Sequence, residues 1–342
     1  DKIMDIIKLE KFLKEKGEKS YRLKQIKKAM FCDLINNWDE ATTLSKELRE
    51  ELKKEFPISS LELINLLESK NKDSMKAVFE LGDKNIIETV LMKHLGRNTV
   101  CVSSQAGCAM NCGFCATGKM GLKRNLTSEE IIDQVLFFAR YLRLSTSNVD
   151  NVVFMGMGEP FLNYDNTIQA IRILNDKDGF NLGIRHISVS TCGIAPEIAK
   201  FADENMQCNL AVSLHAANDK TRSKLMPINN TYPLAVLMKA VDDYVKNTNR
   251  KVMFEYLLIN RVNDRPEDAR NLAKLMKNNL YHVNLIKYHD TESDFKPSLK
   301  LKRDKFFDNL KKLGVSVTFR VSFGEDILAA CGQLAGKINV LL

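Results

Sequence analysis

The chain has 342 residues, 44% of them hydrophobic and 27% charged, and a formal net charge of +8. Its length predicts one large domain and a smaller one, and no apolar run approaches the roughly 20 residues of a membrane span, which excludes a helical membrane protein. Eight cysteines without an evident disulfide framework favour the reducing cytoplasm over a secreted scaffold, and the positive charge favours a polyanionic partner only weakly.

The N-terminal part reads as a small, basic helical unit. Apolar side chains recur at helical spacing in four segments, 5–16, 21–31, 43–56 and 60–69. Thr43 or Ser45 is a plausible N-cap of the third segment. Four basic side chains surround the apolar stripe of the second: Arg22, Lys24, Lys27 and Lys28. Such a face is equally consistent with a solvated helix surface and with a grip on RNA.

The sequence pattern changes near residue 74, from helical spacing to short apolar runs typical of strands. Segments 76–81 and 86–92 read as paired strands joined by a turn at 82–85. Strand candidates then follow at 99–104, 151–156, 186–190, 209–214, 252–258, 282–287 and 315–320. Helix candidates lie between them at 127–143, 165–176, 194–205, 233–247, 266–279 and 302–313. This alternation predicts βαβ units and an open or closed (β/α) barrel, in which chemistry collects at the C-terminal ends of the strands.

Three cysteines, Cys108, Cys112 and Cys115, follow the first barrel strand at CxxxCxxC spacing. Iron–sulfur clusters are normally held by four cysteine thiolates, so three in one loop leave one iron open to a ligand that is not protein. A zinc knuckle is the alternative, but it needs a fourth ligand nearby, and the next cysteine is Cys192. The spacing therefore favours an open-site [4Fe–4S] cluster.

Polar residues also end three of the later strands. Gly156-Met157-Gly158-Glu159-Pro160 follows the second strand, and Ser188–Thr191 and Ser213–His215 close two more. Glycines there let a backbone approach a ligand closely, and Glu159 suits an ammonium group, although a plain turn explains the motif as well. Cys331 lies among small residues near the C-terminus, where either a reactive thiol or a buried structural cysteine fits.

Taken together, these motifs resemble those of the RlmN/Cfr family of radical S-adenosylmethionine (radical SAM) 23S rRNA methyltransferases. The resemblance rests on CxxxCxxC, MGMGEP, the SxST and SLHA strand ends, LMPIN at 225–229 and AACGQL at 329–334, and it runs along nearly the whole chain. It implies a radical SAM partial (β/α)6 barrel with a small N-terminal helical accessory domain. The implied units are an RNA-contacting accessory domain at 1–75, a β-hairpin linker with the general base at 76–98, the barrel at 99–325, and a C-terminal loop with a methyl-carrying cysteine at 326–342.

The resemblance also implies a role for each site residue. The three loop cysteines would bind the [4Fe–4S] cluster, whose open iron S-adenosylmethionine (SAM) chelates. The positions that match SAM contacts are Gly158, Glu159, Ser190, Ser213, Leu214, His215 and His289. At His289 the family usually has asparagine, so a contact made through that side chain would change.

Two further cysteines would carry the methyl-transfer chemistry. The resemblance implies that one SAM methylates Cys331 and that a second, cleaved reductively, gives a radical that takes hydrogen from this methyl group. The resulting carbon radical would add to adenine, Glu88 would remove a proton from the adduct, and Cys101 would resolve it by a transient disulfide with Cys331. This route suits the electrophilic ring carbons of adenine, and a loop nucleotide can leave its stack to react. Lys119, Lys123 and Arg124 would help make the setting electropositive.

The methylated ring carbon is ambiguous in the sequence. Ser322-Phe323-Gly324 and 280–284 lean toward the C8-methylating, Cfr-like branch associated with ribosomal antibiotic resistance, whereas 158–163 keeps the proline and leucine of C2 enzymes. C2 methylation of adenine-2503 is preferred as the widespread activity. We also expect a tRNA adenine as a second substrate and a flavodoxin- or ferredoxin-type electron donor. The enzyme is expected to be a monomer in the cytoplasm, without a membrane partner. The alternatives are a radical SAM enzyme with another substrate and a non-catalytic RNA-binding protein with a structural metal.

Overall fold

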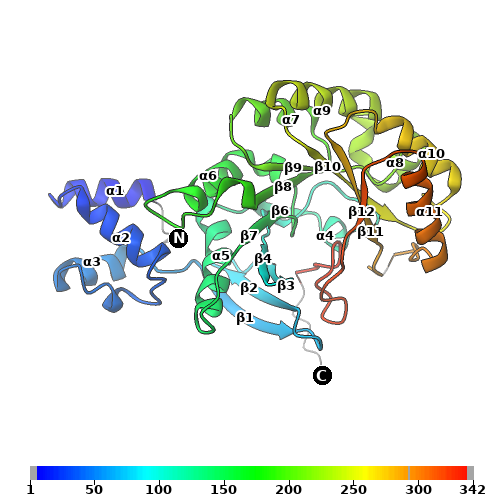
Figure 1. The fold of residues 1–342 in the computed structure, drawn as a ribbon. Coiled ribbons are helices and arrows are strands. Elements are labelled where there is room, and N and C mark those ends of the chain that lie inside the picture. The colour runs from blue at the N-terminus through cyan, green and yellow to red at the C-terminus, as the bar shows by residue number, and fades with distance from the viewer. Residues whose placement is uncertain (1–5, 292, 337–342) are drawn as a thin grey trace.

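The computed structural model describes residues 6–291 and 293–336 (Figure 1). These residues form a small helical module at the N-terminus and a ten-stranded mixed sheet whose parallel part is covered by helices. The expected mixed α/β fold, a partial (β/α) barrel with an N-terminal accessory domain, is confirmed. Residues 1–5 of the predicted accessory domain and 337–342 of the predicted C-terminal loop lie outside the described residues.

The N-terminal module consists of α1 (Ile6–Glu15), α2 (Tyr21–Phe31), the 3-10 turn η1 (Trp38–Glu40) and α3 (Lys46–Glu55). Ser45 caps α3, since its side chain accepts a hydrogen bond from the Leu48 N–H at 3.2 Å. Trp38 is buried and donates its indole N–H to the Phe56 carbonyl at 2.7 Å, which satisfies the one polar atom of a large core side chain.

The predicted helix at 60–69 is wrong, because this segment is strand β1 (Leu61–Glu68). It pairs antiparallel with β2, and the register shifts between Leu63 and Asn65. Such a bulge interrupts the strict alternation of a strand, so the apolar residues fall at spacings that resemble a helix. Hydrogen bonding to the edge of β2 overrides this local pattern.

The predicted hairpin is confirmed as β2 (Ser74–Leu81) and β3 (Ile86–His94), with β4 (Arg97–Cys101) antiparallel to β3. The register sets Val78 opposite Glu88 and Val90 opposite Cys101. Since side chains alternate between the two faces of a strand, Glu88 and Cys101 lie on the same face of this sheet. The C-terminal segment, red in Figure 1, runs back to the same part of the molecule, where Leu328 contacts β2.

The parallel part of the sheet adds strands in chain order from β4 onward. These strands are β7 (Asn151–Phe154), β8 (Ile187–Thr191), β9 (Asn209–Ser213), β10 (Val252–Leu258), β11 (Tyr281–Lys287) and β12 (Val317–Phe319). The helices that connect them are α5 (Ser128–Arg143), α6 (Tyr164–Asn175), α7 (Ala195–Asp203), α8 (Asp219–Leu225), α9 (Leu234–Thr248), α10 (Pro266–Leu275) and α11 (Lys300–Lys312). Sequential order with helical crossovers brings the C-terminal ends of the strands to one rim.

Several short elements were missed from the sequence, most of them on this rim. They are β5 (Gln105–Gly107) and β6 (Leu122–Asn125), which pair with each other, α4 (Ala116–Lys119), and the 3-10 turns η2 (Pro160–Asn163), η3 (Ile184–His186) and η4 (Pro227–Asn230). Each spans four residues or fewer, which is too short to show a hydrophobic period. Together β5, α4 and β6 frame the cysteine loop.

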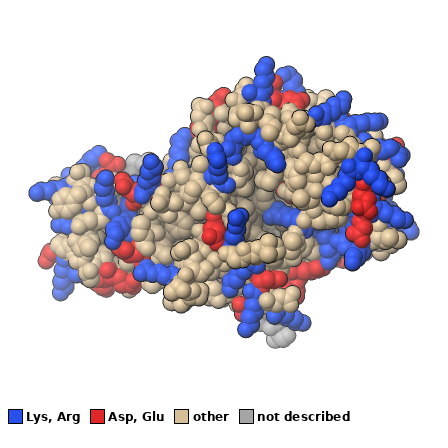
Figure 2. Space-filling view, in the orientation of Figure 1, with Lys and Arg blue, Asp and Glu red and all other residues tan. Residues whose placement is uncertain are grey.

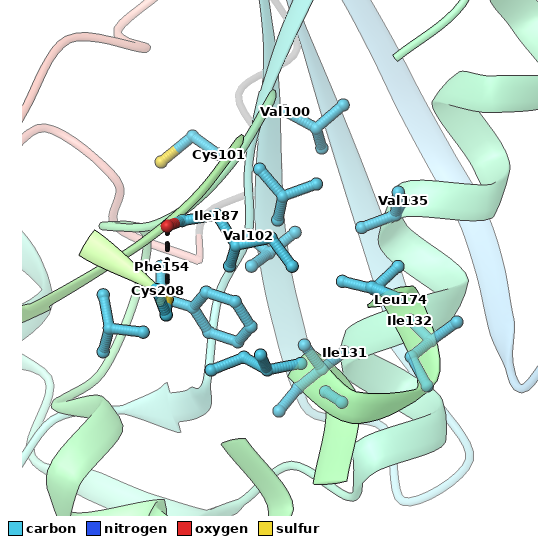
Figure 3. Packing of buried hydrophobic residues seen from close by; sticks show 14 of the residues in the cluster. Val100, Cys101, Val102, Ile131, Ile132, Val135, Phe154, Leu174, Ile187 and Cys208 are labelled. Carbon is cyan, nitrogen blue, oxygen red and sulfur yellow. Dashed lines mark hydrogen bonds between the residues drawn. The ribbon is translucent and has the colours of Figure 1, made fainter. Parts of the chain in front are cut away.

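The main core lies between the strands and their covering helices. Figure 3 shows Val100, Val102 and Phe154 packed toward Ile131 of α5 and Leu174 of α6, all of them buried. The side chain between the two valines, that of Cys101, points the other way, toward the barrel interior (Figure 3). In the part of the chain described, no helix is both long and apolar enough to cross a membrane.

Candidate active site

The cysteine loop is fixed at both ends by backbone hydrogen bonds. The Cys108 N–H donates to the Gly121 carbonyl at 3.1 Å, and the Gly113 N–H donates to the Leu225 carbonyl at the end of α8 at 2.9 Å. Asn111 takes the left-handed conformation (φ 48°) that turns the loop between the first two cysteines. As a result Cys108, Cys112 and Cys115 all line one cavity of about 140 Å³.

The three thiols provide a donor set that suits an iron–sulfur cluster. Burial raises the pKa of Cys108 to about 12 and raises that of Cys115, so these thiols stay protonated unless a metal replaces the proton. The described residues contain no preformed cage of three His, Cys, Asp or Glu ligands. The residues that line the cavity nevertheless suit an iron–sulfur cluster, because one loop presents three soft sulfur donors to it.

Arg222 supports the presence of an anionic group beside this loop. Its side chain is fully buried, and the hydrogen bonds it donates in the described part of the chain all go to neutral acceptors. These acceptors are the Leu214, Cys192 and Ser213 carbonyls and the Asn229 amide oxygen, at 2.7–3.2 Å. Burial lowers the pKa of Arg222. A cluster with three thiolates would supply the counter-charge that a buried cation requires.

The strand-end residues that were matched to SAM mostly line the same cavity. Gly158, Glu159, Ser190, Ser213 and His215 do so, from the ends of β7, β8 and β9. Leu214 is buried just behind this wall, and its N–H donates to a β10 carbonyl. Parallel pairing of β7, β8 and β9 brings these separate motifs to one place.

The Glu159 side chain is fixed by hydrogen bonds to two backbone N–H groups. Its burial raises the pKa of its carboxyl group. One carboxylate oxygen accepts the Phe161 N–H at 3.0 Å and the other accepts the Cys192 N–H at 2.6 Å. Gly158 precedes it at φ 102°, where an added Cβ would lie 2.6 Å from the Gln105 side chain. Only glycine therefore fits at this position without displacing the Gln105 side chain.

His215 is neutral in this site. Burial lowers its pKa to about 3, and its Nδ1 accepts the Leu257 N–H at 3.1 Å. The ring packs edge-on against Phe114 of the cysteine loop, with 4.8 Å between centroids. His215 thus shapes the cavity as an uncharged group that joins the loop to β10.

His289 lies apart from the other matched SAM contacts. It lines a second cavity of about 50 Å³ instead of the cavity of the cysteine loop. Its Nε2 is 3.0 Å from the Ser322 hydroxyl and its Nδ1 is 3.3 Å from a Glu325 carboxylate oxygen. Burial lowers its pKa. The side chain therefore turns toward the C-terminal segment.

Cys331 stands where the two cavities meet. It lines both of them, whereas Cys101 lines only the second. Both cysteines are free thiols; Cys331 is exposed and Cys101 is buried. Burial, together with the nearby Cys331, raises the pKa of Cys101 to about 12. The arrangement places one accessible thiol between the cysteine loop and one protected thiol.

The cation beside these thiols is Arg320, which the sequence did not reveal. It lines both cavities, and its pKa is raised chiefly by the charge of Cys331. The three cations expected there are engaged or placed elsewhere. Lys119 donates to the Thr291 carbonyl at 3.0 Å, Arg124 pairs with Glu130 at 2.8 Å, and Lys123 is exposed and lines neither cavity. Arg320 follows β12 and lies outside the cysteine motifs, so no local pattern marks it.

Glu88, the predicted general base, is buried behind the second cavity and lines neither one. One carboxylate oxygen lies 3.2 Å from the Lys76 ammonium, and the other accepts the Ala335 N–H at 3.3 Å. It shares a sheet face with Cys101. The structure thus brings the proposed base and both thiols to one side of the β2–β3–β4 sheet.

Comparisons with known proteins agree with this site. Residues 102–276 match the model of the radical SAM superfamily, and residues 3–58 match that of the ribosomal RNA large subunit methyltransferase N-terminal domain. The chain is 46% identical over 330 residues to a probable dual-specificity RNA methyltransferase RlmN of Staphylococcus aureus (strains JH9 and Newman), covering 96% of this chain and 90% of that protein. It also resembles a crystal structure of a radical SAM methyltransferase from Sphaerobacter thermophilus, with a TM-score of 0.95, 43% identity and 98% coverage of each chain.

Proposed function

The chain belongs to the RlmN family of radical SAM RNA methyltransferases, and we propose that it methylates C2 of adenine-2503 in 23S rRNA and of a tRNA adenine. Family membership implies a [4Fe–4S] cluster and SAM as cofactors. The relatives' name, a dual-specificity RNA methyltransferase, supports two kinds of RNA substrate. The position of Cys331 between the two cavities carries the proposal.

In this scheme each residue has one task. Cys108, Cys112 and Cys115 hold the cluster, which together with SAM supplies the reductive cleavage chemistry when bound. Residues at the ends of β7, β8 and β9 bind SAM, with the Glu159 carboxylate available to its ammonium group and neutral His215 as an uncharged wall. Two SAM molecules are used in each turnover, one of them to methylate Cys331.

Cys331 carries the methyl group because it is exposed to both cavities. Arg320 lines the same two cavities beside it and supplies a positive charge there, and the thiolate is the nucleophilic form of a cysteine. Cys101 is the resolving thiol: its sulfur attacks the Cys331 sulfur, and a disulfide forms as the bond between Cys331 sulfur and the transferred methylene carbon breaks. That carbon takes up a proton in place of the one lost from the Cys101 thiol, and the methylated adenine is released. Glu88 takes the proton from the adduct. The buried position of Cys101 keeps it protonated until the adduct forms.

The test is to analyse the nucleosides made by the reconstituted enzyme on an rRNA fragment that contains adenine-2503. Mass spectrometry with authentic standards should find 2-methyladenosine. Formation of 8-methyladenosine instead would establish the Cfr-like activity, and an unmodified RNA would reject the substrate. Cys331→Ala should keep its iron and make no product, while Cys208→Ala, which alters a buried cysteine bonded to the Ile187 carbonyl outside both cavities, should be fully active.

A further inference from the structure

Lys76 is a lysine buried in the sheet that carries the proposed base. Its side chain is 2% exposed and that of Glu88 is 1% exposed, and the Lys76 ammonium lies 3.2 Å from a Glu88 carboxylate oxygen. Lys76 is opposite Val90 in the β2–β3 register and Val78 is opposite Glu88. Lys76 and Glu88 are therefore diagonal neighbours on one face of the sheet.

A second contact links Lys76 to the segment that carries the methyl-bearing thiol. Its ammonium donates a hydrogen bond to the Leu328 carbonyl at 3.2 Å, three residues before Cys331. Leu328 has a φ of 52°, a left-handed conformation that leucine rarely adopts and that surrounding contacts must hold. Lys76 thus touches the proposed base and the carrier segment at the same time.

Stability alone does not explain this pair. Buried ion pairs are often no better for stability than well-packed hydrophobic residues of similar volume, because both charges lose their water. The apolar neighbours Val78 and Val90, which share the sheet face of the pair, are buried and show that this region can bury hydrophobic side chains. A charged pair here therefore suggests a role for the charge itself.

We propose that Lys76 is the positioning residue of the proposed general base. Its positive charge keeps the Glu88 carboxylate ionised and ready to take a proton, and its hydrogen bond to Leu328 sets the Cys331 segment in register with that carboxylate. The proposal rests on the proposed function, specifically on Glu88 as the base. Lys76 itself neither gains nor loses a proton in this role.

Among the described residues (6–291 and 293–336), the charged neighbour of Glu88 is Lys76. On the β4 side the titratable group of the same sheet face is the Cys101 thiol. On the C-terminal segment the contact is the Ala335 N–H. The acids of that segment are engaged elsewhere, Glu325 by Lys287 at 2.7 Å and Asp326 by the Lys70 N–H at 2.9 Å. Without its cation, a buried carboxylate favours the protonated form.

The experiment follows decay of the covalent RNA–protein adduct on denaturing gels, from pH 6 to pH 9, in the reconstituted full-length enzyme. Lys76→Met should still assemble its cluster and methylate Cys331, seen as an added methyl mass, because neither step needs Glu88. Its adduct should decay about tenfold more slowly at pH 7, and the midpoint of the pH profile should rise by about one unit. Lys84→Met, at an exposed lysine in the turn of the same hairpin, should behave as wild type.

Two further variants make the outcome decisive. Lys76→Gln keeps a donor for Leu328 but has no charge, so it should show the same pH shift and supplies the readout if Lys76→Met does not fold. Wild-type decay with an unshifted profile in the uncharged variants overturns the proposal. Glu88→Gln tests the role of Glu88 separately from the role of Lys76. This variant should accumulate the adduct; if it does not, Glu88 is not the general base, whatever the Lys76 variants show.

Discussion

Cys331 and Cys101 differ in access although both line the second cavity. Cys331 is exposed, while burial raises the pKa of Cys101 to about 12. A brief treatment of the folded, cluster-free protein with iodoacetamide should therefore alkylate Cys331 and leave Cys101 free, because the thiolate is the reacting form. Peptide mass spectrometry measures both sites, with guanidinium-unfolded protein as the control in which both react. Equal labelling of the folded protein would contradict the proposed division of roles.

The buried side chain of His215 predicts how the stability of the protein depends on pH. Its pKa falls from 6.5 to about 3 on burial, so the unfolded chain takes up a proton that the folded chain refuses. Its contribution to stability is complete above pH 6.5 and is lost as the pH falls toward 3, with a slope of about 1.4 kcal/mol per pH unit. Urea unfolding at pH 5 and 7 should show a smaller pH difference for His215→Gln than for wild type. The exposed His186→Gln should keep the wild-type difference; an unchanged difference in His215→Gln would contradict the assignment.

Longer elements of the barrel were predictable because they cover enough residues to show their period, 2 in strands such as β8 and 3.6 in helices such as α5. The cysteine loop and the strand-end motifs were predictable because their residues are contiguous. Lys76, Arg222 and Arg320 were not, because their roles arise from contacts across the fold. Lys76 and Leu328, for example, are 252 residues apart, and no local pattern reports such a pair. The prediction of a helix at 60–69 was wrong for a related reason, because pairing with β2 makes this segment the strand β1.

Helix α8 links the cysteine loop to the strand ends through Arg222. Replacement by methionine removes donors from three carbonyls and one amide, which should lower the free energy of unfolding by about 3 kcal/mol. It should also lower the iron content after reconstitution, because the counter-charge beside the loop is gone. Denaturant unfolding and iron analysis measure the two effects. Arg172→Met, at an exposed pair with Glu204, is the control. If Arg222→Met is destabilised but binds a normal amount of iron, Arg222 stabilises the strand ends and plays no part in holding the cluster.

On the scale of the whole molecule, basic side chains of α2 join the N-terminal module to the barrel; their pattern in the sequence is equally consistent with a solvated surface and with a grip on RNA. Lys27 pairs with Asp176 at 2.7 Å and Lys24 with Asp178 at 3.4 Å, both after α6. Figure 2 shows acidic side chains interspersed with the basic ones over this module. The basic face of α2 therefore includes contacts between module and barrel, so part of its charge is already neutralised.

A charge swap separates the two roles of Lys27. Lys27→Glu should loosen the module and weaken binding of an rRNA fragment, and the double variant Lys27→Glu/Asp176→Lys should restore it, because the ion pair is rebuilt with its sign reversed. Filter binding at several salt concentrations measures the affinity. If the double variant binds as poorly as Lys27→Glu, Lys27 contacts the RNA directly.

The central claim is that two thiols, Cys331 and Cys101, carry and release the methyl group. Its most direct test is Cys101→Ala, incubated with SAM, a reductant and the rRNA fragment and then run on a denaturing gel. We expect a protein–RNA adduct, with the RNA joined to Cys331, because the thiol that resolves it is missing. Normal yields of methylated RNA without any adduct would contradict the two-thiol account.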